Sequence, residues 1–486
     1  MKLSKLLVVL AVMPLSGVGF SSAAVIKSVQ SGAATFASGQ NTLPVALAAL
    51  DPSKTIVWGG INWGGGRSAN PFPRATRAGY ELSNPTTLNL QRLGAASEST
   101  VVEWQAIEFV SGVAIQRGKA SFLSTDLIIN VPVSTVNISQ TLVLISVATG
   151  ASGQNADEEW TVMARLTSGT NIELSRNQSG SVIDVYWQVV EMSGASVQRG
   201  TLTIPAGDSS ATAVISSVDL SKSFLLLTQK ASAAVNGVES EYTVRGQIAS
   251  PTQLNFDRIS TNNSVDLAWQ VISLADGSSV QAGITTVNSL DLSATAIINP
   301  VVVARTASFV SVRGSIGNSN ADLDEVSFTH TLSTPTSLTV TRAKTGSGVQ
   351  LAWSTIQFNN LSVTVSDSLF SFGAVPLNTW LPPDSSVMTN DGPASENFIG
   401  KISAFASGLN NWALSPTNNG ADLIRAQWST SGASGPWNNI SAYDTDFTIA
   451  TSVPVNGTVP FWFQIQTPTV TSSFNSYSSI LTVTAR

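Results

Sequence analysis

A tryptophan recurs along this chain every 82 to 84 residues, and its neighbours recur with it. The four copies are Trp104, Trp187, Trp269 and Trp353. An arginine comes 11 or 12 residues before each copy, at Arg92, Arg176, Arg258 and Arg342. A period of this length is typical of an array of similar small modules, and it argues against one large core with one active site. We expect the four tryptophans to be buried at equivalent positions in the modules.

A second motif, Val-Gln-x-Gly or Ile-Gln-x-Gly, keeps the same period. Its copies occupy residues 29–32, 115–118, 197–200 and 280–283. Only tight pieces such as Ser111-Gly112 and Ser193-Gly194 separate the tryptophan segment from this motif, which predicts a hairpin between the two. The recurring glycine predicts a close approach of backbone.

Each module is predicted to be an antiparallel β-sandwich. Residues 169–250 contain six short alternating or β-branched stretches separated by Gly, Ser and Asn turns, a pattern typical of a sandwich or small barrel. The repeat stops near residue 366, and residues 367–486 end on an alternating stretch, 480–484. The predicted fold class is therefore all-β, with tandem sandwich repeats and a distinct C-terminal β-sandwich domain.

Recurring Pro-Thr pairs set the predicted module boundaries. They lie at 85–86, 251–252 and 335–336, where a proline can stiffen a connection outside a ladder. This phasing gives whole modules at 86–168, 169–250 and 251–335, partial modules at 25–85 and 336–366, and the C-terminal domain at 367–486. The two partial modules are complementary, so they are expected to pair within one chain or between chains. An alternative phase, from each Val-Gln segment to the next tryptophan segment, leaves four whole modules.

The N-terminus has the features of a secretory leader. Lys2 and Lys5 precede a short apolar run, and Ser22-Ala23-Ala24 supplies the small residues of a cleavage site, so residues 1–24 are predicted to be a signal peptide. No later apolar run approaches the roughly 20 residues of a membrane-spanning helix. We therefore expect a secreted protein at the cell surface or outside the cell, without a membrane span.

Composition limits the partners and the chemistry. Cysteine is absent, which excludes disulfides and thiol catalysis. Charged residues make up 11% of the chain, against roughly 25% in an average protein. Removing Lys2 and Lys5 changes the net charge from −6 to −8, which argues against nucleic acid as a partner.

The closing run of the chain carries a resemblance. Residues 467–469, followed by the stretch from Tyr477 to Thr484, resemble the ends of Ig-like domains in secreted prokaryotic surface proteins. The module array is similar in style to the tandem sandwiches of cell-surface and filament proteins. The resemblance implies a structural role and identifies no functional residues.

Few residues suggest catalysis or metal binding. The only histidine, His330, lies in an alternating strand pattern whose counterparts are predicted to be Arg165 and Arg245. Glu103 and Glu108 share a strand at odd spacing, so they are predicted to face opposite sides. Calcium needs about six to eight oxygen ligands. Its candidate ligands are acidic residues of loops at the module edges, namely Asp157, Glu159, Asp322, Asp324 and Glu325. No other cofactor is indicated.

Tryptophans outside the repeat are candidate contact residues, because flat aromatic faces stack on sugar rings. They are Trp63 in a glycine-rich segment and Trp380, Trp412 and Trp437 of the C-terminal domain. The expected function is that of an exported, non-catalytic structural or adhesive surface protein that self-associates. A carbohydrate-binding surface or appendage protein is the first alternative, and a glycan-active hydrolase with ancillary modules is the second.

Overall fold

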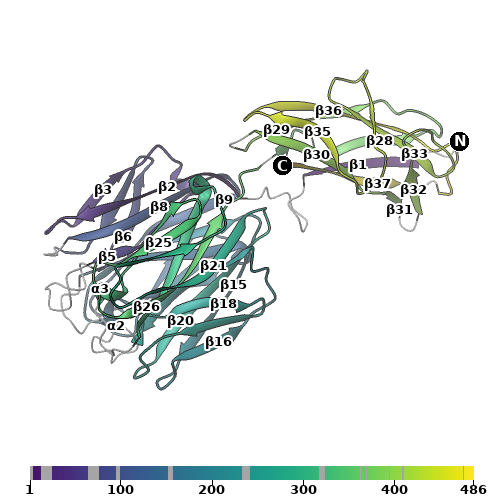
Figure 1. Cartoon of the computed structure of the whole chain (residues 1–486). Coiled ribbons are helices and arrows are strands. Elements are labelled where there is room, and N and C mark those ends of the chain that lie inside the picture. The colour runs from purple at the N-terminus through teal and green to yellow at the C-terminus, as the bar shows by residue number, and fades with distance from the viewer. Residues whose placement is uncertain are drawn as a thin grey trace. The chain divides into compact units, whose positions relative to one another are not determined.

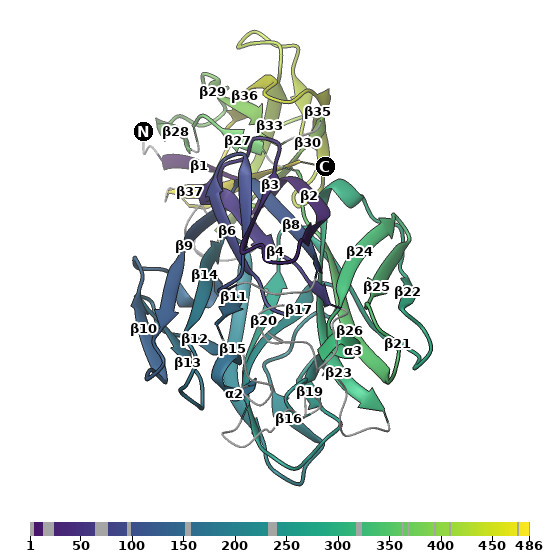
Figure 2. The same ribbon diagram turned by 90° about the vertical axis from the view of Figure 1, so that its left-hand side faces the viewer.

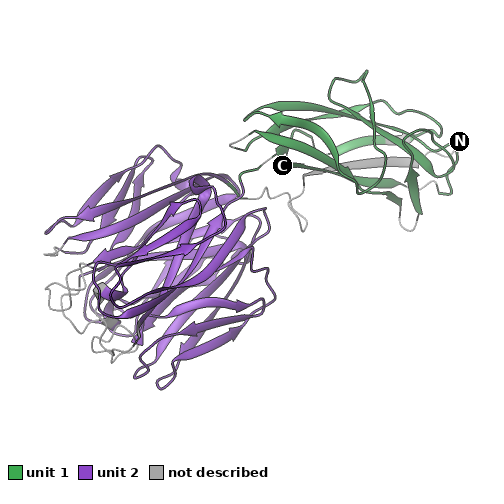
Figure 3. Cartoon of the chain, viewed as in Figure 1, with its two compact units in different colours: residues 1–25, 360–486 green, residues 26–359 purple. Residues whose placement is uncertain are grey.

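A computed structural model describes residues 4–12, 24–63, 76–94, 99–150, 157–231, 241–316, 323–361, 363–367, 369–392, 395–407, 410–473 and 476–485. The chain forms two compact units, one of residues 26–359 and one of residues 1–25 with 360–486 (Figure 3). Both consist of sheets of mainly antiparallel strands with hardly any helix (Figure 1), which confirms the predicted all-β class. Within the described ranges, no helix is long and apolar enough to cross a membrane.

The larger unit contains four modules of similar strand order, which we number 1 to 4. Module 1 consists of β2 (Val25–Phe36), β3 (Thr42–Ala46), β4 (Thr55–Trp58), β5 (Ile61–Trp63), β6 (Gly79–Asn84), β7 (Thr87–Gln91) and β8 (Thr100–Ser111). Module 2 consists of β9 (Val113–Phe122), β10 (Ile128–Pro132), β11 (Thr141–Thr149), β12 (Met163–Ser168), β13 (Asn171–Ser175) and β14 (Ile183–Met192). The four-residue helix α2 (Asp157–Trp160) lies between β11 and β12.

Modules 3 and 4 repeat this order. Module 3 consists of β15 (Ala195–Ile204), β16 (Ser210–Val214), β17 (Ser223–Ala231), β18 (Arg245–Ser250), β19 (Gln253–Asp257) and β20 (Val265–Leu274). Module 4 consists of β21 (Ser279–Val287), β22 (Ser293–Ile297), β23 (Thr306–Ile316), β24 (Thr329–Thr334), β25 (Ser337–Thr341) and β26 (Gly348–Gln357), with the short helix α3 (Leu323–Val326) before β24.

Every module is built from two small antiparallel sheets. The first has the tryptophan strand at its centre, flanked by the Val-Gln strand and by the third strand of the module, in the orders β2-β8-β4, β9-β14-β11, β15-β20-β17 and β21-β26-β23. The second has the arginine-side strand at its centre, in the orders β3-β7-β6, β10-β13-β12, β16-β19-β18 and β22-β25-β24. Alternation of buried and exposed residues along these strands directs one face of each sheet into the core.

The predicted hairpin between the tryptophan and Val-Gln segments is wrong. The tight turns at Gly112 and Gly194, both at positive φ, connect strands of different modules: β9 pairs with β14, and β15 pairs with β20. Sheet pairing therefore follows the alternative phase, from each Val-Gln strand to the next tryptophan strand. The strands of residues 25–85 pair with β7 and β8, and β25 and β26 pair inside module 4, so the expected complementation of half-modules does not form.

The four modules close into a ring (Figure 2). The glutamine after the tryptophan reaches the third strand of the preceding module: Gln188 bonds to the backbone N and O of Val57 at 2.9 and 2.7 Å, and Gln270 bonds to those of Val143 at 2.9 Å each. Gln105 of module 1 makes the same pair of contacts to Ser308 of module 4, at 3.0 and 3.3 Å. One apolar core cluster contains buried residues of all four modules.

The interface between modules 3 and 4 departs from this pattern. Ser354 stands where the other modules have glutamine, and Ala282 stands where modules 2 and 3 have Arg117 and Arg199. Those two arginines bind backbone carbonyls of the preceding module, at Thr55 and Thr141 respectively. With both long side chains replaced, a cavity of about 450 Å³ lies beside Ser354.

Each repeated tryptophan packs on the glycine of a Val-Gln-x-Gly motif. Gly118, Gly200 and Gly283 lie directly opposite Trp187, Trp269 and Trp353 in the sheets. A Cβ added to any of these glycines would lie 2.5 to 2.6 Å from Cζ2 of the indole, and Gly32 stands in the same relation to Trp104 at 2.8 Å. Trp104, Trp269 and Trp353 are buried and Trp187 is half-buried. The glycine makes room for the indole.

In modules 2 to 4 the repeated arginine binds backbone carbonyls of its own module. In module 3 the guanidinium of Arg258 donates to the carbonyls of Pro205, Asp208, Glu241 and Asn263. Arg176 and Arg342 bind equivalent carbonyls in modules 2 and 4. Buried carbonyls of irregular loops need such donors, which explains why the arginine recurs in modules 2 to 4.

The second unit is sandwich-like, and its described strands belong to one larger sheet. Its strands are β1 (Ser4–Val12), β27 (Val363–Val365), β28 (Leu369–Val375), β29 (Asp384–Asn390), β30 (Glu396–Ile402), β31 (Phe405–Ser407), β32 (Asn410–Leu414), β33 (Leu423–Ser429), β34 (Asn438–Asn439), β35 (Phe447–Val453), β36 (Thr458–Gln466) and β37 (Tyr477–Ala485). An aromatic core including Phe370, Trp412, Phe461 and Phe463 holds it together. Strand β1, from the predicted leader, lies between β28 and β37.

Candidate binding cavity and the module seam

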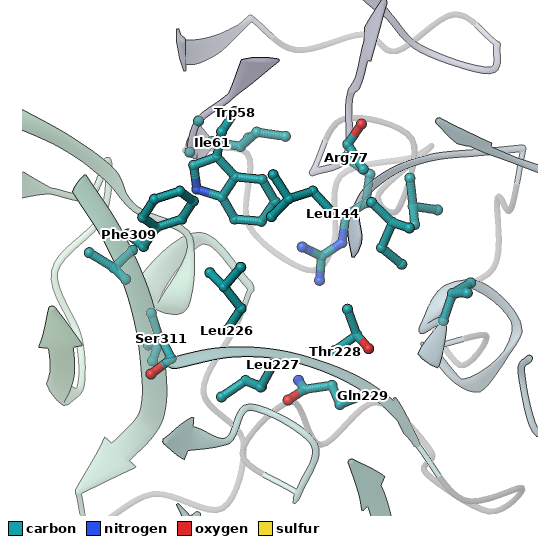
Figure 4. Close-up of a pocket in the computed structure, with 18 of the residues that line it drawn as sticks. Trp58, Ile61, Arg77, Leu144, Leu226, Leu227, Thr228, Gln229, Phe309 and Ser311 are labelled. Atoms are coloured by element: carbon teal, nitrogen blue, oxygen red, sulfur yellow. The ribbon is translucent and has the colours of Figure 1, made fainter. Parts of the chain in front are cut away.

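A cavity of about 350 Å³ lies at the centre of the ring, where the third strands of the four modules converge (Figure 4). Its apolar lining includes one residue at an equivalent position of each module: Trp58, Leu144, Leu226 and Phe309. Each of these residues is the cross-strand partner of the position that follows the repeated tryptophan. Equivalent positions of the four sequence repeats therefore line the cavity.

Two further sets of equivalent residues line the cavity. Two positions beyond the apolar set come Gly60, Ser146, Thr228 and Ser311, and the segments that precede the fourth strands contribute Arg77, Thr161, Thr243 and Ser327. The Ser146, Thr228 and Ser311 hydroxyls accept hydrogen bonds at 3.0 to 3.1 Å from backbone N–H groups of the preceding module. These hydroxyls thus join neighbouring modules while facing the cavity.

Three residues of the cavity wall carry a buried side-chain polar atom that has no hydrogen-bond partner among the described residues. The atoms are Nε1 of Trp58 and Nε1 of Trp160, both donors, and Oε1 of Gln229, an acceptor; the amide nitrogen of Gln229 donates to the carbonyl of Tyr242. Burying such a group without a partner costs about 1–3 kcal/mol. A bound molecule with an acceptor and a donor would satisfy Trp58 Nε1 and Gln229 Oε1.

The wall also carries one cation. The guanidinium carbon of Arg77 lies 4.4 Å from the centroid of the Trp160 ring, a cation–π contact between modules 1 and 2. The equivalent positions in the other modules are Thr161, Thr243 and Ser327, so this charge breaks the symmetry of the ring. The described lining residues include no Asp, Glu or His.

The two acidic calcium candidates whose side chains the structure describes, Glu159 and Glu325, do not come together. Glu159 and Glu325 belong to different modules, and each faces a loop of its own module. Glu159 accepts a hydrogen bond from Ser181, and the Glu325 carboxyl lies beside Gly346. Asp322 lies outside the described residues, as do the side chains of Asp157 and Asp324. The described part of the chain has no group of three or more His, Asp or Glu placed to hold a metal ion.

The sequence singled out Trp63 as a contact residue, and this prediction is wrong. Its side chain is fully buried and belongs to the shared core of the ring. The reason is that Trp63 ends β5, which pairs with β8 at Thr100 and so points the indole into the module. Trp58, five residues earlier, is the tryptophan that reaches the cavity.

Trp412 of the C-terminal unit is also not a surface residue. It is fully buried, stacks on Tyr477 with ring centroids 3.9 Å apart, and donates from Nε1 to Thr471 at 3.0 Å. Trp380 and Trp437 are half-buried, and the Arg425 guanidinium carbon lies 5.0 Å from the Trp380 ring centroid. Only these two of the four candidate contact tryptophans keep accessible surface.

A buried polar cluster lies at the seam where module 1 meets module 4. Nδ1 of His330 is 2.9 Å from the Ser308 hydroxyl, and its Nε2 is 3.6 Å from a carboxyl oxygen of Glu103. The Glu103 carboxyl accepts hydrogen bonds from Gln105 at 3.0 Å and from the Gly60 N–H at 3.1 Å. His330 pairs with Val340 in its sheet, so its true counterparts are Ala164 and Gly246, one position away from the predicted Arg165 and Arg245 alignment.

The seam cluster is uncharged near neutral pH. Desolvation raises the pKa of Glu103 to about 8, against the opposing effect of its hydrogen bonds. Desolvation also lowers the pKa of His330 to about 4. The carboxyl is therefore protonated and the imidazole neutral, so their 3.6 Å contact is not an ion pair.

Serine, histidine and glutamate in one cluster resemble a hydrolytic triad in composition only. Ser308, His330 and Glu103 are each at most 3% exposed, and none of them lines the central cavity. A nucleophile needs an adjacent space for the reacting carbonyl and for oxyanion donors. Glu108 is separate from the cluster and binds Lys27 and the backbone N–H of Asp51. The cluster joins the first and last modules.

The fold and the cavity define an all-β protein in which a closed ring of four modules is joined to a separate sandwich. A comparison of the chain with protein-family models and with curated proteins found no match. The residues of the cavity wall escaped sequence reasoning, although Trp58, Leu144, Leu226 and Phe309 recur at intervals of 82 to 86 residues. These residues differ in type, so their regular spacing is harder to detect in the sequence than the spacing of the four identical tryptophans.

Proposed function

We propose that this is an exported, non-catalytic surface protein of the structural or adhesive class, which holds a small ligand or a ligand side group in the central cavity of its ring. The observation that carries the proposal is that buried polar atoms without a partner among the described residues, including the donor Trp58 Nε1 and the acceptor Gln229 Oε1, belong to the wall of one cavity. The cavity volume of about 350 Å³ lies at the small end of ligand sites, which span about 300–1,000 Å³.

The chemistry of the wall supports binding over catalysis. Glycoside hydrolysis commonly uses two carboxyl groups that flank the scissile bond. The described wall offers hydroxyls, amides, indoles and a guanidinium instead. These groups donate and accept hydrogen bonds, and the hydroxyl, amide and indole groups keep the same charge across physiological pH.

A carbohydrate is the second candidate ligand class. An aromatic face together with amide and hydroxyl hydrogen-bonding groups is the combination that recognises a sugar ring. The cavity supplies Trp58, Gln229 and Thr243, and Arg77 would favour a sugar that carries a carboxylate. We infer export and a cell-surface location from the predicted leader sequence. Self-association remains part of the proposal, although pairing of half-modules is not its mechanism.

A glycan array followed by calorimetric titration of residues 25–486 tests the proposal. Trp58→Phe keeps an aromatic ring and removes the N–H donor, and Gln229→Leu removes the amide. We expect each change to weaken binding about threefold to tenfold, the range of one net hydrogen bond. Trp437→Phe in the other unit is the control and should bind normally. Binding that survives both cavity variants and is lost in Trp437→Ala would place the ligand on the C-terminal unit.

A further inference from the structure

Strand β1 occupies an interior position in the sheet of the C-terminal unit. Residues 6–12 pair in parallel with residues 477–483 of β37, and residues 4–9 pair antiparallel with β28. In the sheet order β1 lies between these two strands, and among the described strands β28 has no other partner. The segment predicted to be removed as a leader is therefore the connection between β28 and the rest of the sheet.

Removal of this segment would open a slot between β28 and β37, which we call the strand slot. The backbone N–H and C=O groups of both strands along the slot would then have no ladder partner. Such groups are costly to leave unpaired where they are shielded from water, and an open strand edge recruits another strand. The opening is seven residues long on the β37 side, from Tyr477 to Val483.

The floor of the slot is apolar. Tyr477, Leu481 and Val483 of β37 are fully buried in the core of this unit. On the other side Phe370 of β28 is 1% exposed, and its ring lies 5.7 Å from that of Phe463. A strand in the slot would place every second residue over this core, because side chains alternate between the two faces of a sheet.

We propose that the strand slot of the exported chain receives an extended segment of a partner polypeptide. The segment runs parallel to β37 and antiparallel to β28, spans about seven residues at a strand rise of about 3.3 Å each, and carries apolar residues at alternate positions with no proline. The register of β1 shows the required pattern: Leu6, Val8, Leu10 and Val12 stand opposite Tyr477, Ser479, Leu481 and Val483. This inference rests on the proposed export, since it requires that residues 1–24 be removed.

The occupant comes from a different polypeptide for a structural reason. In the described part of the exported chain, every strand except β28 has a partner in its own sheet, and β28 forms one wall of the slot, so a second exported copy offers no spare strand. Addition of a strand from a partner is a known mode of peptide recognition, in which main-chain hydrogen bonds supply affinity and side-chain pockets supply specificity. The slot provides both.

The test uses residues 25–486 and a synthetic peptide of residues 4–12. We expect one peptide to bind per chain and to slow amide hydrogen exchange in residues 369–375 and 477–483. A control peptide with Val8→Pro and Leu10→Pro lacks two backbone donors and should bind at least about tenfold more weakly. The chain that retains residues 1–24 should bind no peptide, because its slot is filled.

Other outcomes would overturn the inference. If residues 369–375 and 477–483 exchange as slowly in residues 25–486 alone as in the full chain, the slot has closed and accepts no strand. If the exported chain forms oligomers that the peptide dissociates, a second copy is the occupant and the assignment to a different polypeptide is wrong. Mass spectrometry of the exported protein separates this inference from the proposed function: an N-terminus at Met1 contradicts both, whereas an N-terminus at Val25 without peptide binding contradicts the slot alone.

Discussion

At the scale of single residues, each repeated tryptophan packs so closely on a glycine that a Cβ atom at the glycine position would clash with the indole. A Cβ on Gly200 would lie 2.5 Å from the Trp269 ring, so Gly200→Ala must displace the indole or the strand. We expect a loss of about 1–3 kcal/mol in the free energy of unfolding, the usual cost of overpacking. Urea unfolding measures it. Thr201→Ala, at the exposed neighbouring position, is the control and should change stability by less than about 0.5 kcal/mol.

The seam residues Glu103 and His330 predict how stability depends on pH. Between pH 6.5 and 8 the unfolded chain has Glu103 ionised while the folded chain keeps its proton, so stability falls as pH rises, by about 2 kcal/mol. Between pH 4.5 and 6.5 the lowered pKa of His330 acts in the opposite direction. Glu103→Gln should abolish the fall above pH 6.5 and leave a rise from pH 4 to 6.5.

Urea unfolding at pH 4.5, 6.5 and 8 checks this dependence. Glu108→Gln on the same strand leaves the Glu103 carboxyl in place, so the fall between pH 6.5 and 8 should persist in that variant. An unchanged profile in Glu103→Gln would mean that the seam carboxyl does not hold its proton in the folded protein.

At the scale of elements, we expect the interface between modules 3 and 4 to stabilise the ring least of the four interfaces between neighbouring modules. Ser354 has a shorter side chain than the glutamine of the other modules, and it lines a cavity of about 450 Å³ together with Leu225 of the third strand of module 3. Ser354→Gln should fill part of this cavity and raise the unfolding free energy by about 0.5–2 kcal/mol. Gln270→Ala at the preceding interface should have the opposite effect, because it leaves the buried N–H and C=O of Val143 unpaired. Thermal unfolding of both variants checks the pair.

At the scale of the whole molecule, the ring is expected to unfold as one cooperative unit. Its modules share a core, and the Ile26 N–H donates to the Asn359 carbonyl at 2.8 Å, which joins the two ends of the ring. Calorimetry should therefore show two transitions, one for the ring and one for the sandwich. Deleting residues 279–358 should remove the ring transition and leave the sandwich transition in place. A separate transition for each module would contradict ring closure.

The sequence was sufficient to predict the repeat and the all-β class, because the tryptophan and the arginine are required in every module. It was insufficient for the module phase, since the short turns at Gly112 and Gly194 suit a hairpin and a link between modules equally well. Ring closure depends on Gln105 meeting Ser308, 203 residues away, and no local pattern reports such a contact. The cavity wall was missed because its equivalent residues differ in chemistry.

The differences among these equivalent residues have a consequence for how a ligand would be oriented. A cavity with four identical walls would hold an unsymmetrical molecule equally well in four rotated poses. Here module 1 contributes Arg77 where the other modules have hydroxyls, and module 3 contributes Gln229 where the others have Ile61, Val147 and Val312. Modules 1 and 3 face each other across the ring, so the divergence of duplicated copies has given the cavity a polarity. We therefore expect an unsymmetrical ligand to bind in one of the four rotated poses in preference to the other three.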